Sequence, residues 1–312
     1  MIFLTSLLIL YGVHRVYKSL NGADLIRDPW DWWKLSRRSL HQWNAVYAQN
    51  PTTSDIVVCL TTIPSRIDLI SDTLKSLMAQ TRRPQRIRLH IPEYSIREQC
   101  AYTLPEWLHG LKDIDIIRCP DYGPSTKLIP ALEAFDPDQK LLVVDDDRLY
   151  PSDMIDKSHF WSQARVDCAI ASGGWLAPDD LTDRQTTLRR NVLMTPPTPV
   201  LGTRIRKPHP VDILIGYAGY LVRPRFFEID RLTDYTGAPE AAFYVDDVWI
   251  SAHCRVQKVV FPTNRLCFKS WHHRGVFSRT SLGRLNCGEG DPEKRNNTRL
   301  LRYFKDRWLN AE

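Results

Sequence analysis

Three consecutive aspartates, Asp145-Asp146-Asp147, follow the apolar run at residues 141–144. Four apolar residues, two of them β-branched, predict a fully buried strand. Adjacent carboxylates repel one another, and burying a charge is costly unless a partner compensates it. Mg²⁺ or Mn²⁺ is such a partner, because these ions bind carboxylate and phosphate oxygens together. The motif predicts a metal and phosphate site where open α/β sheets bind ligands. An acidic cap on a helix near Pro151 is the alternative.

A second acidic pair, Asp246-Asp247, lies about a hundred residues later, where the sequence predicts the start of a helix. A helix dipole favours negative charge at its N-terminus, so capping is the simpler explanation of this pair alone. A sugar hydroxyl that attacks an electrophile needs a general base within hydrogen-bond distance, and a carboxylate shielded from solvent suits that role. The pair is therefore a candidate catalytic group.

His272, in a short run with Trp271 and Arg274, is a candidate metal ligand. A neutral imidazole can complete a metal shell, and the neighbouring arginine can pair with a phosphate. A histidine on a surface loop is an equally good interpretation of the same residues.

The loop after the first predicted strand contains hydroxyl groups and an arginine, which suit a nucleotide and its phosphates. Its candidate donor-binding residues are Thr61, Thr62, Pro64 and Arg66. Lys127 follows a later turn and would add a second cation at the same edge of the sheet. Asp145 and Asp146 complete the predicted donor side.

Two glycine- and aromatic-containing segments in the second half predict the sugar and acceptor side of the site. Trp and Tyr rings can stack on sugars, and glycines allow close approach of the backbone. The candidate residues are Gly174, Trp175, Gly216, Tyr217 and Gly219.

Strand and helix patterns alternate between residues 55 and 145, and these elements must position the candidate groups. Such alternation predicts an α/β fold with a mostly parallel central sheet and helices on both faces. The expected strands are residues 56–60, 87–91, 114–117 and 141–144, and the expected helices are residues 70–78, 95–109 and 127–135.

The second half is less regular. Its expected elements are strands at 169–172 and 213–222, a long loop at 178–210, a helix from about Asp246 and a basic helix at 296–309. The apolar side of this last helix is expected to dock on the domain, with binding to a membrane surface as the alternative.

Composition narrows the class of protein. A chain of 312 residues with ordinary apolar content fits one large domain, and its net charge of +6 favours anionic ligands or a membrane surface. No nucleic-acid-binding motif is visible. The seven cysteines are scattered without a Cys-x-x-Cys pair, which indicates reduced thiols in a cytosolic setting and argues against zinc.

Residues 1–50 are expected to form an appendage, and residues 51–312 a single catalytic domain. Within that domain we expect a nucleotide half (51–150), an acceptor half (151–290) and a C-terminal helix (291–312). Residues 1–13 are almost wholly apolar and are followed by basic residues. Thirteen residues are too few to span a bilayer comfortably, so a shallow membrane anchor or a short signal-anchor is preferred over a core helix. The tryptophans between residues 30 and 43 fit a membrane interface and a packed helix equally well.

Three segments resemble the nucleotide-sugar half of GT-A glycosyltransferases of the family-2-like group; they are residues 60–66, 74–81 and 144–147. The resemblance covers about residues 55–175. Residues 122–127 and 245–250 are also similar to segments of bacterial proteins assigned to surface-polysaccharide synthesis.

The resemblance implies roles for particular residues. In that family an Asp-x-Asp element holds Mn²⁺ or Mg²⁺ on a nucleoside diphosphate, a role that falls here on Asp145 and Asp147. The family's catalytic Glu-Asp pair matches Asp246-Asp247, with Asp in place of Glu, which makes Asp247 the expected base. The Gln-x-x-Arg-Trp motif of the processive, membrane-embedded synthases in that family is absent from the sequence. Its absence favours transfer of single sugars.

The expected function is metal-dependent, inverting transfer of a sugar from a nucleotide-sugar, UDP-linked, to a glycan or lipid-linked acceptor. The expected location is the cytoplasm, peripheral to a membrane, without nucleic-acid partners. A sugar-1-phosphate nucleotidyltransferase would need a glycine-rich phosphate loop, which the loop after the first strand lacks. A hydrolase with paired carboxylates and a catalytically silent nucleotide- or sugar-binding module also fit the acidic motifs.

Overall fold

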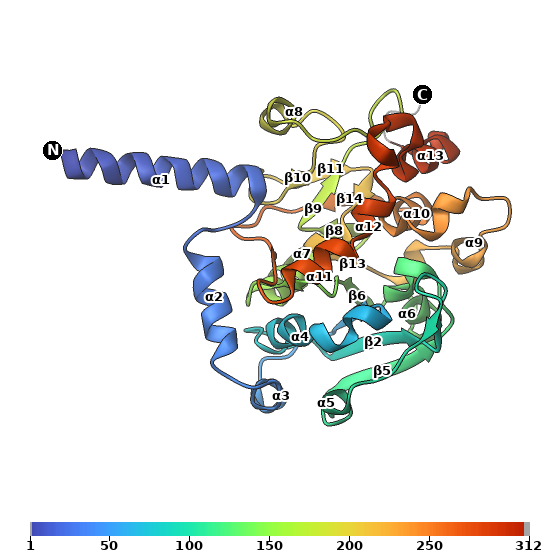
Figure 1. The fold of residues 1–312 in the computed structure, drawn as a ribbon, viewed down its shortest axis with the longest axis horizontal. Coiled ribbons are helices and arrows are strands. Elements are labelled where there is room, and N and C mark those ends of the chain that lie inside the picture. Colours follow the sequence, from blue (N-terminus) through green and yellow to red (C-terminus); the bar gives the residue numbers. More distant parts are fainter. Residues whose placement is uncertain (1, 309–312) are drawn as a thin grey trace.

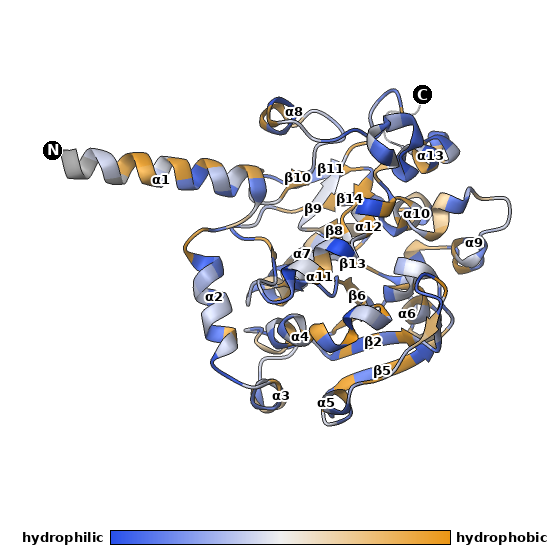
Figure 2. Cartoon of the chain, in the orientation of Figure 1, coloured by the Kyte–Doolittle hydropathy of each residue, from blue (hydrophilic) through white to orange (hydrophobic). Residues whose placement is uncertain are grey.

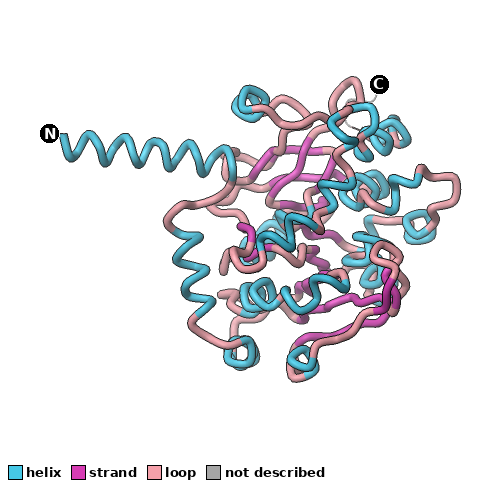
Figure 3. The backbone as a smooth tube through the Cα atoms, viewed as in Figure 1, coloured by secondary structure: helices cyan, strands magenta, loops and turns pink. Residues whose placement is uncertain are grey.

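The fold is a mixed α/β arrangement in which helices surround a central sheet (Figure 1). A computed structural model describes residues 2–308, apart from the side chains of residues 2–4 and 7. The α/β class predicted from the alternation of strands and helices is confirmed. Figure 3 shows the strands at the centre of the molecule and the helices around them.

Within the described residues the central sheet has eight strands, in the order β11-β14-β8-β13-β6-β1-β2-β5. The pairs β1–β2, β1–β6, β2–β5 and β8–β14 are parallel, whereas β13 runs antiparallel between β6 and β8, and β11 is antiparallel to β14. The strands are β1 (Ile56–Thr61), β2 (Arg86–Pro92), β5 (Ile114–Cys119), β6 (Lys140–Val143), β8 (Cys168–Ala171), β11 (His209–Val211), β13 (Tyr220–Val222) and β14 (Gln257–Val260).

Strand β1 is buried on both faces, which explains its continuous apolar sequence. Ile56, Val58 and Leu60 pack on one face of the sheet, and Val57 and Cys59 pack on the other; all five are fully buried. The alternation places one hydrophobic core on each side of the sheet, because successive strand side chains point to opposite faces.

The two cores are covered by different helices. Helices α3, α4, α5 and α7 contribute buried residues to the core that contains Val58, and helices α6, α9, α10 and α13 contribute to the core that contains Val57. The helices are α1 (Ile2–Asn21), α2 (Arg27–Ser36), α3 (Leu40–Gln49), α4 (Ser71–Met78), α5 (Glu106–His109), α6 (Ile129–Ala134), α7 (Met154–Ala164), α8 (Leu188–Leu193), α9 (Ile229–Thr233), α10 (Asp246–His253), α11 (Arg274–Arg279), α12 (Leu282–Leu285) and α13 (Asn296–Tyr303).

Two sequence predictions of elements were wrong. The expected helix at 95–109 is a small hairpin, β3 (Tyr94–Ser95) with β4 (Cys100–Ala101), followed by the four-residue α5. Gln99 turns the hairpin in the left-handed region, at φ 53°. The expected strand at 213–222 is broken into β12 (Ile213–Leu214), a 3₁₀ turn and β13, because Gly219 has φ 85°.

Short strands outside the central sheet position the rest of the site. Strand β9 (Gly173–Trp175) lies between β10 (Val200–Leu201) and β12, and β7 (Arg148–Leu149) pairs with β15 (Phe268–Lys269). Strand β10 and helix α8 interrupt the region expected as one long loop at 178–210.

The N-terminal helices differ in their surroundings. Trp43 and Tyr47 of α3 are buried, and the Tyr47 hydroxyl donates to the Pro84 carbonyl at 2.9 Å, so α3 packs on the main body. Helix α1, in contrast, projects away from it (Figure 1). None of the helices within residues 2–308 combines the length and apolar character needed to cross a bilayer.

The C-terminal helix docks on the domain as predicted. Leu300 and Leu301 of α13 are fully buried and Trp308 is nearly so. Helix α13 ends at Tyr303 and is followed by a 3₁₀ turn, so the expected helix at 296–309 is shorter; position 309 lies outside the described residues.

Candidate active site

A cleft of about 370 Å³ lies at the carboxyl ends of β1 and β6. This volume falls in the range of small-molecule sites. Both acidic motifs line it: Asp145, Asp146 and Asp147 follow β6, and Asp246 and Asp247 begin α10. The tertiary structure thus joins two carboxylate groups that are about a hundred residues apart in the sequence.

Other predicted residues also line this cleft, while some do not. Those that line it are Thr61, Thr62, Arg66, Lys127, Trp175 and Tyr217. Among the described residues, the lining does not include Pro64, Gly174, Gly216, Gly219 or His272.

Lys127 connects the two acidic motifs. Its side chain is almost fully buried, and its Nζ lies 2.7 Å from Oδ1 of Asp145 and 2.6 Å from Oδ2 of Asp246. Burial alone would lower the pKa of this ammonium group, but the carboxylates of Asp145 and Asp246 outweigh it and hold the pKa well above the usual value. Lys127 therefore stays charged and supplies the cation between the motifs.

Asp247 is held by a tight turn of the neighbouring segment. Its Oδ1 accepts the backbone N–H of Gly216 at 2.9 Å. A Cβ atom on Gly216 would lie 2.5 Å from Nζ of Lys127 and 3.0 Å from Oδ1 of Asp247, so a side chain at this position would displace the Lys127 ammonium group from its place beside the carboxylates. Gly216 thus supports the site through its backbone, although it does not line the cleft.

The surroundings of Asp247 favour its protonated form. Burial, and then the negative charge of Asp246, raise the pKa of the Asp247 carboxyl well above its usual value, while Lys127 and the Gly216 N–H oppose this rise. A raised pKa in a cleft is a recognised feature of general bases that work near neutral pH.

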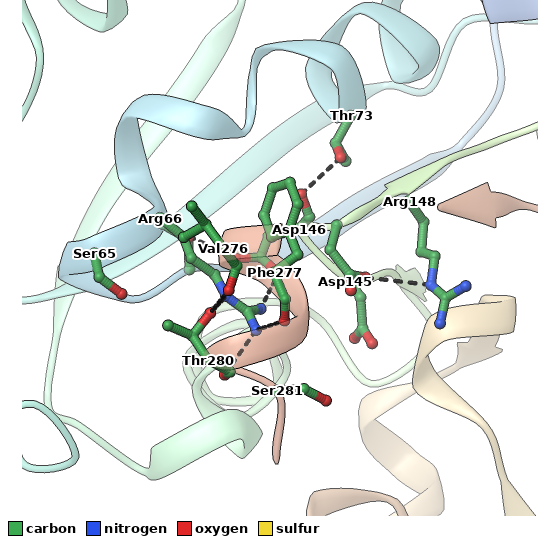
Figure 4. A network of polar contacts seen from close by, with 12 residues as sticks. Ser65, Arg66, Thr73, Asp145, Asp146, Arg148, Val276, Phe277, Thr280 and Ser281 are labelled. Carbon is green, nitrogen blue, oxygen red and sulfur yellow. Dashed lines mark hydrogen bonds and ion pairs between the residues drawn. The ribbon is translucent and has the colours of Figure 1, made fainter. Parts of the chain in front are cut away.

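Asp146 is the most buried of the three aspartates and is held by three side chains. Thr62 Oγ1 donates to its Oδ2 at 2.6 Å. Arg66 Nη1 donates to its Oδ1 at 3.0 Å, and Thr73 Oγ1 donates to its carbonyl oxygen at 2.7 Å (Figure 4). Burial raises the pKa of Asp146, and Arg66 and Thr62 oppose this shift. Asp146 therefore anchors the loop that carries the other two aspartates.

Arg66 also fastens helix α11 beside the cleft. Its Nε and Nη2 donate to the side chain and carbonyl of Thr280, each at 2.7 Å, and Nη2 donates to the Phe277 carbonyl at 3.2 Å (Figure 4). Arg97 donates to the same Thr280 carbonyl. The chain then continues into Ser281, which lines the cleft.

Replacing Arg66 by alanine should destabilise the fold and loosen this wall of the cleft. Asp146 would lose its cationic partner while still buried, which typically costs roughly 3 kcal/mol. Urea unfolding should show a fall of that size, whereas Arg82→Ala, which breaks a more exposed pair with Asp156, should change stability by less than about 1 kcal/mol. Equal, small effects for both variants would contradict the anchoring role.

The structure does not bring His272 together with Asp145 and Asp147. His272 Nδ1 pairs with Oδ2 of Asp72 at 2.8 Å, and its ring lies 5.1 Å from that of Trp32. Across residues 2–308, no three His, Cys, Asp or Glu side chains are grouped to hold a metal ion. Within the described residues, His272 is therefore not grouped with the two aspartates.

Asp145 and Asp147 nevertheless fit a metal ion that is shared with a substrate. Mg²⁺ is usually bound by one or two carboxylates together with substrate phosphates and waters. The Asp145 side chain is 30% exposed and Asp147 also lines the cleft, with its Oδ1 3.2 Å from Nε of Arg148. This donor set suits a metal held partly by a diphosphate, not a closed protein cage.

Three of the predicted site residues, Gly174, Gly219 and Pro64, shape the backbone and do not line the cleft. A Cβ on Gly174 would lie 2.7 Å from Cγ2 of Val211 and 2.8 Å from the Ile213 carbonyl, so this glycine serves packing within β9. Gly219 provides the positive φ before β13, and Pro64 begins a 3₁₀ helix.

Several basic residues of the cleft were missed by sequence reasoning. Arg148, Arg97, Lys269 and Arg295 all line it. Arg148 directly follows the three aspartates, so its position in the sequence could have indicated that it belongs to the site. Its guanidinium lies 4.4 Å from the Tyr217 ring centre. Arg97 fell in a segment predicted as a helix, and Lys269 and Arg295 reach the cleft only through tertiary contacts.

Comparison with known proteins gives distant structural matches. No family model matches the chain. No curated protein matches it either. Mannosyltransferase PcManGT from Pyrobaculum calidifontis, in complex with GDP-Man and Mn²⁺, is 12% identical, with 96% of this chain and 81% of that chain covered and a TM-score of 0.44.

Two structures of S. aureus TarS 1–349 also match, both at 12% identity. For the first, 69% of this chain and 60% of that chain are covered, at a TM-score of 0.40. For the second, in complex with UDP, 81% and 71% are covered, at a TM-score of 0.41. The chain thus spans less than two thirds of the first TarS structure. Similarity at this distance does not identify a reaction.

Proposed function

We propose that this protein is a glycosyltransferase of GT-A type, which transfers a sugar from a UDP-sugar to a hydroxyl of a glycan or lipid-linked acceptor at the cytoplasmic face of a membrane. One observation carries the proposal. A partly exposed carboxylate (Asp145) and a buried carboxyl with a raised pKa (Asp247) line one cleft. Lys127 holds Asp145 close to Asp246, the residue before Asp247. The resemblance of residues 55–175 to that family supports the same conclusion.

The donor side is formed by the ends of β1 and β6. Thr61 and Thr62 line the cleft, and we assign them to the nucleotide. Asp145 and Asp147 would hold Mn²⁺ or Mg²⁺, and when bound this ion neutralises charge on the departing diphosphate. The cleft's arginines, Arg97 and Arg148, add donors suited to phosphate oxygens.

Asp247 performs the proton transfer in this mechanism. Its carboxylate accepts the proton of the acceptor hydroxyl, the acceptor oxygen forms a bond to the anomeric carbon, and the bond from that carbon to the diphosphate breaks. Direct displacement inverts the anomeric centre. Trp175 and Tyr217 line the same cleft and offer rings on which sugars can stack.

The first test is a thermal-shift screen of UDP- and GDP-sugars with and without Mn²⁺, followed by transfer assays on an acceptor panel. The proposal expects a rise in melting temperature with a UDP-sugar that is larger with Mn²⁺, and product formation with at least one acceptor. Tight donor binding without turnover would indicate a silent binding module, and release of free sugar alone would indicate a hydrolase.

Metal dependence is tested by Asp147→Asn and by EDTA. We expect Asp147→Asn to abolish Mn²⁺-dependent transfer while the protein stays folded, because the amide keeps the shape but loses the charge that binds the ion. Asp230→Asn, on the exposed surface of α9, is the matched control and should leave transfer unchanged. Undiminished transfer by Asp147→Asn, or by the native chain in EDTA, would overturn the metal role.

A further inference from the structure

Helix α1 projects from the body (Figure 1), and the middle of the helix, at residues 8–13, is a continuous apolar stretch apart from Gly12. Figure 2 shows hydrophilic residues closer to the end that joins the body. Leu8, Ile9, Leu10 and Tyr11 are between 61% and 65% exposed. Consecutive residues of an α-helix are spread around its axis at 3.6 per turn, so four in a row reach every side. A helix that is apolar all round is normally surrounded by a core or by lipid. A docked protein partner would require only one apolar stripe.

The positive charge of the chain is concentrated next to this helix in space. Residues 2–21 and 185–209 contain seven Lys and Arg residues and no Asp or Glu. The rest of the chain has 35 basic and 36 acidic residues, so the net charge of +6 comes from these two segments. Of the seven, Arg15, Arg189, Arg206 and Lys207 are exposed.

Helix α8 and residues 203–207 lie beside the end of α1 that joins the body. The Asn191 side-chain amide donates to the Leu20 carbonyl at 3.3 Å, and Arg204 Nη1 donates to Oδ1 of Asn191 at 2.9 Å. Helix α8 also exposes apolar side chains, with Leu188 73% and Leu193 63% exposed. Helix α1, helix α8 and residues 203–207 together form what we call the basic–apolar surface.

We propose that the basic–apolar surface docks on an anionic phospholipid bilayer, with α1 immersed among headgroups and upper acyl chains and the basic residues of α8 and 203–207 at the headgroups. Apolar burial and attraction to anionic lipids together drive this kind of interfacial binding. Helix α1 supplies the apolar part, and exposed Arg189, Arg206 and Lys207 supply the charge. The proposal does not depend on the transfer reaction.

The test is flotation of the full chain with vesicles of phosphatidylcholine alone and of phosphatidylcholine mixed equally with phosphatidylglycerol. We expect binding to the mixed vesicles and at least about tenfold weaker binding to the neutral ones. Arg206→Glu with Lys207→Glu should weaken binding to the mixed vesicles at least about tenfold. The matched control, Lys112→Glu with Arg118→Glu, changes the charge equally near the distant β5 edge and should bind as the native chain does.

The apolar contribution is tested separately by Leu8→Asp with Leu10→Asp. This variant should lose most binding to both kinds of vesicle but keep its melting temperature, because neither side chain is covered in the folded chain. Equal binding by this variant would overturn the proposal. A second outcome would also overturn it: the native chain does not bind vesicles and sediments as a dimer, and the Leu8→Asp and Leu10→Asp variant sediments as a monomer. A second copy of the chain would then cover α1.

Discussion

Asp247→Asn is expected to reduce sugar transfer by at least about 10²-fold, and by up to about 10⁴-fold, because the amide cannot accept the acceptor proton. The asparagine Oδ1 can still accept the Gly216 N–H that Asp247 binds at 2.9 Å, so the turn should remain in place. Donor binding, measured by calorimetry with UDP, should stay close to that of the native chain. Turnover within about threefold of the native rate would contradict the role of Asp247 as the base.

The pH dependence of transfer follows from the same carboxyl group. Only the deprotonated form of Asp247 acts as a base, and its pKa is raised, so kcat/KM should increase with pH through this raised pKa and then level off. The assignment would be contradicted if kcat/KM were constant at all pH values above the ordinary aspartate pKa of about 3.9.

Titration of Asp247 should also affect the stability of the fold, but in the opposite direction: stability should fall as pH rises. An acid whose pKa is higher in the folded chain than in the unfolded chain stabilises the fold at low pH, and this contribution is lost as pH rises toward the folded-state pKa. Asp247→Asn removes the titration. The stability of the variant relative to the native chain should therefore increase with pH above about 4, as measured by urea unfolding.

Lys127→Met is expected to have the largest effect on stability. The substitution leaves Asp145 and Asp246 without the ammonium group that lies within 2.7 Å of both. Removing one partner of a buried ion pair typically costs about 3–5 kcal/mol, and urea unfolding should show a loss in that range. Transfer should also fall, since the two acidic motifs would repel each other across the cleft.

Lys140→Met provides the matched control for this prediction. Lys140 is buried to a similar degree, but its partner Asp55 is 59% exposed and lies at the opposite end of β6. We expect a smaller loss of stability and normal turnover, because water can solvate Asp55 once the lysine is gone. Adding Asp246→Asn to Lys127→Met should restore part of the lost stability, since it removes one of the repelling charges. If Lys127→Met and Lys140→Met were indistinguishable, the bridging role of Lys127 would be wrong.

The strands and most helices of the first half could be predicted because their signals are local. The apolar run at 56–60 is continuous since β1 is buried on both faces, and the helix at 71–78 repeats apolar residues at helical spacing. The hairpin at 94–101 could not be predicted in this way. It depends on a left-handed turn at Gln99, a conformation that a glutamine does not signal.

The sequence by itself determined that one group of aspartates follows a buried strand and that a second group begins a helix. Residue type and order alone carry that information. Only the tertiary structure decided which charges meet. It placed Lys127 between Asp145 and Asp246, and it paired His272 with Asp72. Ion pairing depends on distances of a few ångströms between segments that are far apart along the chain, and those distances are set by how helices and strands pack.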